Sequence, residues 1–321
     1  MAGAMRAAVI DTVGDSVTPR LAEIPRPFRV NDEFVVEVAA ASMNPIDVKT
    51  MAGRGASAAI AAFPAVLGCD FSGVVLESPY EGHRLQPGDA VYGMLPVPHY
   101  SGSFAEIAAV PGLVIAPKPV GLSHTDAAAV PLAALTAWGA VVELAKAHQG
   151  QRMLIHAGSG GVGHFAVQFA SYFGAHVIAT GSTRNLEWLH SLGAAEVVDY
   201  TAARFEDVVK NVDVVIDLIG NTADDTGTRS LSTLRRGGLI VNVPSGSWPT
   251  LAADASEAGV RATTFRVAPD AKTLAIITRL LEQGEIRVHV EQIFELDGIA
   301  DAFAAIAGEH TRGKLVVRVK P

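Results

Sequence analysis

A glycine-rich segment, HAGSGGVGHF at residues 156–165, has the spacing with the clearest chemical meaning. Gly158, Gly160 and Gly163 fit the G-x-G-x-x-G pattern, with an apolar run before them and a helical pattern after them. Glycine at a tight turn lets the backbone approach a pyrophosphate, whose charge then lies at the amino end of a helix that is expected to begin near Val162. The segment predicts a bound dinucleotide. Its expected contacts are Gly158, Ser159, Gly160, Gly161, Val162 and Gly163.

The next expected strand bears on which dinucleotide is bound. A free ribose 2′-hydroxyl is usually held by an acidic residue about 20 positions further on. The stretch VIATGSTRNLEW has no carboxylate before Glu187. Small hydroxylated residues followed by an arginine suit a 2′-phosphate, although Arg184 is also explained as a solvated residue at a helix start. The pattern favours NADPH over NADH. The residues assigned to this contact are Thr180, Ser182, Thr183 and Arg184.

Alternating strands and helices are expected to position these residues. Apolar β runs that alternate with helices imply βαβ units in a parallel sheet. One of the helices is expected around Leu231 to Arg235. Ligands bind beyond the carboxyl ends of such strands, which adds Gly220, Pro244 and Ser245 to the cofactor site. The expected strands are 152–157, 177–180, 196–200, 212–220, 237–246 and 261–267.

The regions on either side of these alternating strands and helices have a different residue pattern. The first 125 or so residues are short β-rich stretches split by turns, which predicts an irregular, mostly antiparallel β domain. A helical stretch follows, and Ser123 with Asp126 resembles an N-terminal cap. The tail returns to a helix at 271–283, two further strands and another helix. We expect an α/β protein in which a dinucleotide domain, 126–267, is inserted into a catalytic domain made of 1–125 and 268–321.

Composition excludes several classes of function. The chain has 321 residues, of which 49% are hydrophobic and 18% charged, as in a well-buried enzyme. Its net charge of −8 disfavours nucleic acid and anionic membranes as partners. Apolar stretches end before the roughly 18 residues of a membrane span, and no export signal is expected. The one cysteine, Cys69, excludes an intrachain disulfide. A cytoplasmic location follows as the default expectation.

Several further strings resemble one family in its own order along the chain. They are AASMNPIDVK, LGCDFSGVV, PGDAVYG, GSFAEIAAV, PLAALTAWGA, HAGSGGVGHFAVQFA, LGAAEVVDY, VDVVIDLIG and TRGKLVVRV. Together they span the chain from Ala40 to near its end. The chain resembles the zinc-independent quinone oxidoreductases of the medium-chain dehydrogenase/reductase superfamily. The resemblance implies a GroES-like catalytic domain that carries an inserted Rossmann domain.

The resemblance also argues against a catalytic metal. Zinc-dependent alcohol dehydrogenases of the superfamily carry a cysteine where this chain has Asn44, and Gly-His-Glu where it has Gly68, Cys69 and Asp70. Without that cysteine and histidine the open zinc site does not form as it does there. Cys69 beside Asp70 is explained as a lone buried thiol, and no metal is expected. His99 and Tyr100 are expected either at the edge of the active-site cleft that the resemblance implies or on a surface loop.

A nicotinamide enzyme without zinc is better suited to reducing an electrophilic alkene than to oxidising an alcohol. In a conjugated carbonyl the oxygen already carries the developing negative charge, and the protein supplies orientation and a donor. Lys49 is the candidate donor, with a solvated lysine as the alternative. Many quinone reductases of the family carry a tyrosine in or near this stretch, but the segment TMAGRG directly after Lys49 has none, which puts strict quinone specificity in doubt. By resemblance, Asn44 faces the nicotinamide, and Asp47 orients local backbone.

Two further positions match family residues near the cofactor. Thr136 resembles a threonine beside the nicotinamide, although a helix threonine bonded to its own backbone is the alternative. Tyr200 falls where the family contacts the adenine phosphate. Asn185 stands where the family often places a lysine, which leaves the phosphate contact to Arg184.

Three functions remain open at this point. The first is NADPH-dependent reduction of a quinone or an α,β-unsaturated carbonyl. The second is reduction of an enoyl thioester in a biosynthetic pathway, and the third is a non-catalytic NADPH-binding sensor or structural protein. A homodimer that pairs through the last strand of the Rossmann domain, 261–267, is a family-based expectation.

Overall fold

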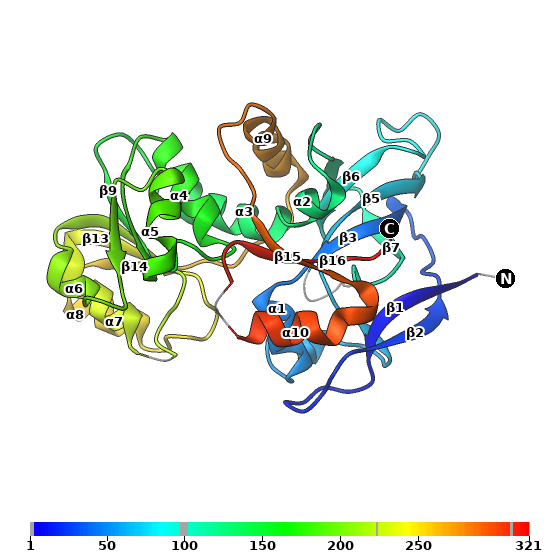
Figure 1. Cartoon of the computed structure of the whole chain (residues 1–321), viewed down its shortest axis with the longest axis horizontal. Helices are drawn as coiled ribbons and strands as arrows, with labels where there is room; N and C mark the ends of the chain where they lie inside the picture. The colour runs from blue at the N-terminus through cyan, green and yellow to red at the C-terminus, as the bar shows by residue number, and fades with distance from the viewer. Residues whose placement is uncertain (1–2, 97–101, 223, 309–310, 321) are drawn as a thin grey trace. The chain divides into compact units, whose positions relative to one another are not determined.

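The chain folds into two compact units (Figure 1). The structure is a computed structural model that describes residues 3–96, 102–222, 224–308 and 311–320. The first unit combines Met1–Leu135 with Ala268–Pro321, and the second is Thr136–Val267. The division falls at 135/136 rather than at the expected 125/126, because α2 (His124–Ala128) packs on β3 and β5 of the first unit.

The first unit is built on mostly antiparallel β-sheet. Its larger sheet has the order β15 (Val290–Glu295), β16 (Lys314–Arg318), β3 (Glu33–Ser42), β5 (Asp70–Glu77), β6 (Ala90–Met94) and β8 (Ile115–Pro117), and β7 (Ile107–Pro111) also pairs with β3. Among the strand pairs of this sheet that the structure describes, β15 and β16 are parallel and all the others are antiparallel. A smaller sheet has the order β2 (Arg20–Pro25), β1 (Ala4–Ile10) and β4 (Ala65–Val66).

The helices of the first unit come from distant parts of the chain. Figure 1 shows α1 (Pro45–Met51) beside α10 (Ile299–Ala307), and the two are in contact. The predicted cap is confirmed, because the hydroxyl oxygen of Ser123 accepts from the Asp126 backbone N–H at 3.0 Å. The helical stretch after it is interrupted at Pro131, where α3 (Pro131–Trp138) begins and continues into a π-helical turn at Gly139–Leu144. The remaining long helix is α9 (Ala271–Glu282).

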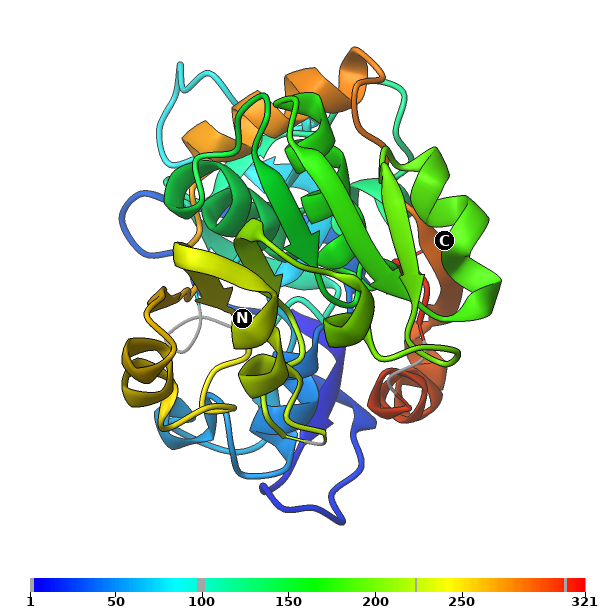
Figure 2. The same ribbon diagram turned by 90° about the vertical axis from the view of Figure 1, so that its left-hand side faces the viewer.

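The second unit is a doubly wound parallel sheet. Its strand order is β11 (Glu196–Asp199), β10 (His176–Gly181), β9 (Arg152–Ile155), β12 (Val212–Asp217), β13 (Leu234–Asn242) and β14 (Arg261–Thr264). The first strand in sequence, β9, lies in the middle, and the order reverses beside it, as in dinucleotide-binding sheets. Helices lie on both faces of this sheet (Figure 2). They are α4 (Gly163–Tyr172), α5 (Leu186–Ser191), α6 (Phe205–Val208), α7 (Thr226–Ser230) and α8 (Leu251–Glu257).

One expected helix is wrong. Residues 231–235 were expected to be helical, but α7 ends at Ser230 and a short 3₁₀ turn, Leu231–Thr233, leads directly into β13. Leu234 already pairs with Val212 of β12, so sheet pairing overrides the local helical preference. Other 3₁₀ turns are Ser57–Ala59, Thr183–Asn185 and Leu296–Gly298.

Apolar side chains from neighbouring strands form the core of the second unit. Leu154, Ile178, Val215 and Ile240 come from four adjacent strands and belong to one buried cluster with Trp248. Burial of this kind, at about 25 cal/mol per Å² of apolar surface, fixes the strand ends that carry the site.

Among the described residues no helix combines the length and the apolar character needed to cross a bilayer.

Candidate active site

The glycine turn joins β9 to the ten-residue helix α4. A Cβ on Gly163 would lie 2.0 Å from the carbonyl oxygen of Ala157, so no side chain fits there. Ala157 itself has a φ of 48°, which is uncommon for a residue with a side chain. The backbone N–H of Gly158 donates to the carbonyl oxygen of Thr180 at 3.0 Å. The turn is therefore held tightly between β9, β10 and α4, as close approach of a pyrophosphate requires.

Two buried side chains support this turn from below. The hydroxyl of Thr180, which is 2% exposed, accepts from the Ala157 N–H at 3.2 Å and lies 3.3 Å from Nδ1 of His156. Nε2 of His156 lies 2.8 Å from the hydroxyl oxygen of Ser230. Burial lowers the pKa of His156 to about 4, so the ring is neutral at pH 7. Thr180 thus shapes the turn through a buried side chain. Reasoning from the sequence missed His156. Its position directly after β9 is the only signal that could have identified it.

Asn185 links the glycine turn to the end of β10. Its side-chain NH₂ donates to the hydroxyl oxygens of Ser159 at 3.1 Å and Ser182 at 3.2 Å, and the residue is 4% exposed. The family often has a lysine at this position, which would contact a phosphate directly. The asparagine instead fixes two hydroxyl groups that were both predicted to bind the cofactor.

The end of β11 brings a carboxylate beside the predicted phosphate contacts. Thr183 donates its hydroxyl hydrogen to Oδ2 of Asp199 at 2.5 Å, and Gly181 is the strand partner of Asp199. Hydrogen bonds from Thr183 and Thr201 hold the pKa of Asp199 below its usual value, so it is ionised at pH 7. Sequence reasoning looked for an acid along β10 and missed one on the next strand. The backbone N–H of Tyr200 donates to Gly181, and the Tyr200 side chain is 57% exposed.

The ends of β12 and β13 form a second hydrogen-bonded group. Asp217 accepts from the Gly220 N–H and from the side-chain NH₂ of Asn242, both at 2.8 Å. Gly220 has a φ of +76°, and a Cβ there would lie 2.1 Å from the hydroxyl oxygen of Ser247, so glycine is required. Pro244 and Ser245 lie just beyond β13, after Val243, and Ser245 is exposed. Asp217 and Asn242 organise this edge but were not predicted.

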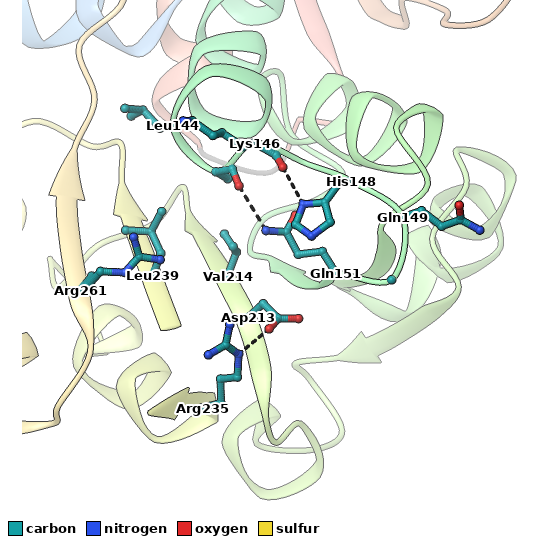
Figure 3. Close-up of a pocket in the computed structure, with 12 residues that line it drawn as sticks. Leu144, Lys146, His148, Gln149, Gln151, Asp213, Val214, Arg235, Leu239 and Arg261 are labelled. Atoms are coloured by element: carbon teal, nitrogen blue, oxygen red, sulfur yellow. Dashed lines mark hydrogen bonds and ion pairs between the residues drawn. The ribbon is translucent and has the colours of Figure 1, made fainter. Parts of the chain in front are cut away.

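A pocket of about 470 Å³ lies at the other edge of the same sheet (Figure 3). Part of its lining comes from the segment 144–151, and the amino ends of three strands contribute Asp213 on β12, Arg235 on β13 and Arg261 on β14. Asp213 and Arg235 form an ion pair at 2.5 Å that faces this pocket. Dinucleotides bind beyond the carboxyl ends of parallel strands, so this pocket is not the cofactor site.

A buried polar cluster in the first unit contains Asn44. The side-chain NH₂ of Asn44 donates to Oδ2 of Asp70 at 2.9 Å, and its Oδ1 accepts from the Lys314 ammonium at 2.6 Å. Nζ of Lys314 also donates to the carbonyl oxygen of Met43 at 2.8 Å. The carboxylate of Asp47 accepts from the Asn44 backbone N–H at 2.8 Å and closes a capping box on α1. The expected structural role of Asp47 fits this contact. Lys314 was not predicted.

Burial governs the ionisation of this cluster. It raises the pKa of Asp47 to about 7 and raises the pKa of Asp70, which the nearby Lys314 ammonium opposes. Burial likewise lowers the pKa of Lys314, which the Asp70 carboxylate opposes. The pKa of Cys69 is raised well above its ordinary value, so it is a protonated thiol, as a lone buried cysteine should be.

The remaining predicted residues lie in different environments. Lys49 is exposed in the last turn of α1, and its side chain has no hydrogen bond or ion pair with another described residue. Thr136 is buried on α3, at 4% exposure. Arg184 is exposed within the 3₁₀ turn Thr183–Asn185. His99 and Tyr100 lie outside the described residues.

In the part of the chain that the structure describes, the donors at the expected metal positions do not fit a catalytic zinc ion. Such sites use three protein ligands from Cys, His and carboxylates. Within the described ranges, no group of three or more such residues is placed to hold a metal ion. At the two positions that matter, Cys69 is a buried thiol and the amide oxygen of Asn44 already accepts from an ammonium. A second cation beside the Lys314 ammonium would be repelled.

Comparisons with known proteins agree with both units. A model of the family described as zinc-binding dehydrogenase matches residues 192–317, a range that contains neither Asn44 nor Cys69. A model of the alcohol dehydrogenase GroES-like domain matches residues 30–120. The solved structure of a quinone oxidoreductase from Coxiella burnetii has a TM-score of 0.92 and 34% identity, and the match covers 99% of this chain and 100% of that one.

Curated relatives give the same picture across most of the chain. The mitochondrial NAD(P)H oxidoreductase RTN4IP1 of Mus musculus is 34% identical over 90% of this chain and 82% of its own. A 2-methylene-furan-3-one reductase of Solanum lycopersicum is 34% identical over 90% of this chain and 72% of its own. The chain therefore belongs to the medium-chain dehydrogenase/reductase superfamily, among its quinone oxidoreductase-like NAD(P)H-dependent oxidoreductases.

Proposed function

We propose that the chain is an NADPH-dependent reductase that transfers hydride to a quinone or an α,β-unsaturated carbonyl without zinc. The observation that carries this proposal is the 2.6 Å hydrogen bond from the Lys314 ammonium to Oδ1 of Asn44. It engages a residue that stands where zinc-dependent relatives have a metal ligand. Without a metal to polarise an alcohol oxygen, the suitable substrate is one whose own conjugation accepts the charge.

The chemistry requires little more than orientation and one donor. When bound, NADPH would supply a hydride for the β-carbon of the substrate, the alkene electron pair would move onto the carbonyl oxygen, and the resulting enolate would take up a proton from solvent. The glycine turn and the hydroxyl groups fixed by Asn185 bind and orient the cofactor. Asn44 positions the nicotinamide end, and the exposed ammonium of Lys49 donates to the developing enolate oxygen. Orientation and a charged donor are the two contributions a protein makes to such a step.

The preference for NADPH rests on Arg184 and the hydroxyl groups around it. An arginine fork matches the geometry of a phosphate, and Ser182 lies close to it in sequence. Thr183 adds no donor, because its hydroxyl hydrogen is donated to Asp199. Asp199 acts in the opposite direction, because its carboxylate repels a 2′-phosphate. We propose that the attraction of Arg184 outweighs this repulsion.

We also propose the cytoplasm as the location and a homodimer as the assembly.

Two relatives support the substrate class. One solved structure is named for quinone reduction, and the tomato relative is named for a furanone that carries a methylene group beside its ketone. Both names describe an acceptor in which conjugation places the new charge on oxygen. We carry this substrate class to the present chain as part of the proposal.

Consumption of NADPH against a panel of quinones, enones and enoyl thioesters tests the function. We expect steady NADPH oxidation with quinones or enones, unchanged after treatment with a chelator, and no stoichiometric zinc by elemental analysis. Turnover confined to enoyl thioesters would move the assignment to a biosynthetic reductase. Binding of NADPH without oxidation by any member of the panel would favour the sensor. Activity lost on chelation together with bound zinc would contradict the metal-free mechanism.

A further inference from the structure

Lys314 is a buried lysine with no step in the proposed reaction. Its side chain is 4% exposed, and lysine is almost never buried without partners. Nζ donates to the carbonyl oxygen of Met43 at 2.8 Å and to Oδ1 of Asn44 at 2.6 Å. Oδ2 of Asp70 lies 3.8 Å from the same nitrogen. The partners of the ammonium are thus Asn44 and the groups that surround Asn44.

Three neighbouring strands bring these residues together from distant parts of the sequence. Val316 of β16 pairs with Ser42 at the end of β3, and Ser42 also pairs with Asp70 at the start of β5. Lys314 begins β16, and Asn44 follows β3 by two residues. The sheet register therefore brings the ammonium, the amide and the carboxylate to the same end of three neighbouring strands.

The two charges decide which way the Asn44 amide points. In the observed orientation the carbonyl oxygen accepts from the ammonium and the NH₂ donates to Asp70. Rotation by half a turn would place the NH₂ against the Lys314 ammonium and the carbonyl oxygen against the Asp70 carboxylate. Both contacts would then be repulsive, because an ammonium has no acceptor and a carboxylate has no donor. Lys314 and Asp70 together exclude the second orientation.

We propose that Lys314 is a positioning residue, which holds the side chain of Asn44 in one orientation for its contact with the nicotinamide. This proposal rests on the proposed function for the role of Asn44. In zinc-dependent members of the superfamily the cation near this position is a metal ion, whereas here the cation is part of the chain. Lys314 itself touches neither cofactor nor substrate and acts through Asn44.

Kinetics of Lys314→Met test this role, because methionine keeps the length of the side chain and removes its charge. We expect kcat with the best quinone or enone to fall about 10- to 100-fold, the loss typical of a misoriented reacting group. The dissociation constant of NADPH should change by less than about twofold, because the glycine turn and Arg184 provide most of the binding. A lysine with a purely structural role would leave kcat per folded enzyme unchanged, and that result would overturn the proposal.

A double-variant cycle shows whether the effect passes through Asn44. If Lys314 acts only by orienting that amide, Asn44→Ala with Lys314→Met should be no slower than Asn44→Ala alone. Independent losses that multiply would contradict the proposal. Lys320→Met is the matched control, since this lysine lies near the same end of the chain but forms an exposed ion pair with Glu37. Its kcat should equal that of the wild type.

Removal of Lys314 alone leaves a buried carboxylate unpaired, which often destabilises a protein strongly. If Lys314→Met does not fold, the variant that combines it with Asp70→Asn removes both charges and their desolvation cost. The amide of Asn44 then has no charged partner on either side. Turnover should remain reduced in this folded variant, whereas wild-type turnover would overturn the proposal.

A readout without substrate separates this proposal from the proposed function. With ¹⁵N-labelled asparagine, the side-chain NH₂ signal of Asn44 is identified by its loss in Asn44→Ala. We expect it to shift and to lose protection from hydrogen exchange in Lys314→Met but not in Lys320→Met. An unchanged signal would overturn the positioning role. If the signal changes but no quinone or enone is reduced by the wild type, the proposed function fails and the orienting role stands.

Discussion

The hydroxyl of Thr183 donates to the carboxylate of Asp199 at 2.5 Å, across the gap between the ends of β10 and β11. The hydroxyl hydrogen of Thr183 is thereby used and is not offered to a phosphate. The same edge of the sheet carries Arg184, one position further along. A cation and a carboxylate therefore stand close to the expected adenosine ribose, and they favour different cofactors.

Arg184→Ala should weaken NADPH binding while leaving NADH binding almost unchanged. A hydrogen bond to a charged group contributes about 1.5–3 kcal/mol, which corresponds to a loss of about one to two orders of magnitude in NADPH affinity. Dissociation constants of both cofactors, measured by fluorescence titration, check this. Arg261→Ala is the control, because Arg261 begins β14 at the amino ends of the strands, whereas the cofactor is expected at their carboxyl ends. Equal weakening of both cofactors would place the phosphate contact elsewhere.

Asp199→Asn should have the opposite effect and tighten NADPH binding. The exposed carboxylate and a nearby 2′-phosphate repel each other through water, so we expect about fivefold tighter binding once the charge is removed. The gain should shrink as salt is added, because an exposed interaction is screened. Isothermal titration at two ionic strengths measures both effects, with Asp207→Asn, an exposed aspartate on α6, as control. Weaker NADPH binding in Asp199→Asn would show that this carboxylate does not face a phosphate.

Lys49→Ala should lower turnover by about 10²-fold or more, the scale expected when a donor to a developing oxyanion is removed. Its side chain is exposed and forms no hydrogen bond or ion pair with another described residue, so its loss should cost little stability. Steady-state kinetics and thermal melting of the same preparation give both quantities. Lys272→Ala, on α9, serves as a control for loss of a lysine at a helix. Near-normal turnover would make Lys49 an ordinary surface residue.

Glu206→Gln should remove part of the acid sensitivity of folding. Arg229 donates to both oxygens of Glu206 at 2.8 Å, and these bonds lower the pKa of Glu206 to about 2. A carboxyl whose folded pKa lies below its unfolded value of about 4.3 stabilises the fold above that pH, and the stabilisation is lost as pH falls towards 2. At pH 7 the free energy of unfolding should therefore be lower for the variant than for the wild type.

The difference between the two proteins should shrink as the pH is lowered from about 4.3 towards 2. Urea unfolding at a series of pH values measures it, and Glu257→Gln on α8 provides an exposed control. A difference that is constant with pH would mean that Glu206 contributes by packing and not by its charge.

Thr264→Glu should weaken the proposed homodimer. β14 lies at the end of the six-stranded sheet, and an uncovered edge strand is a template for pairing with a second copy. An exposed charge there meets its own copy across a two-fold axis and opposes pairing. Light scattering at micromolar concentration should show a dimer for wild type and for Ala195→Glu beside the opposite edge strand, β11. A wild-type monomer would contradict the assembly.

Local patterns in the sequence determined the second unit and its turn. The glycine spacing of 158–163 and the alternation of apolar strands with helices are short-range features, and they specified both the parallel sheet and the β9–α4 turn. The cap at Ser123 is equally local and is confirmed. The helix expected at 231–235 failed for a non-local reason, since pairing with β12 draws Leu234 into β13.

Only the tertiary structure decided which charges surround the predicted residues. Asp199 reaches Thr183 because β10 and β11 are neighbours, and Lys314 reaches Asn44 because β16 and β3 pair across most of the length of the chain. The sequence shows that Asn44 stands where zinc-dependent relatives have a metal ligand. The lysine whose ammonium donates to the amide oxygen of Asn44 lies 270 positions away. Spacing along a chain predicts contacts within a turn or a helix. Contacts between strands depend on sheet order and register, which follow from packing of the whole unit.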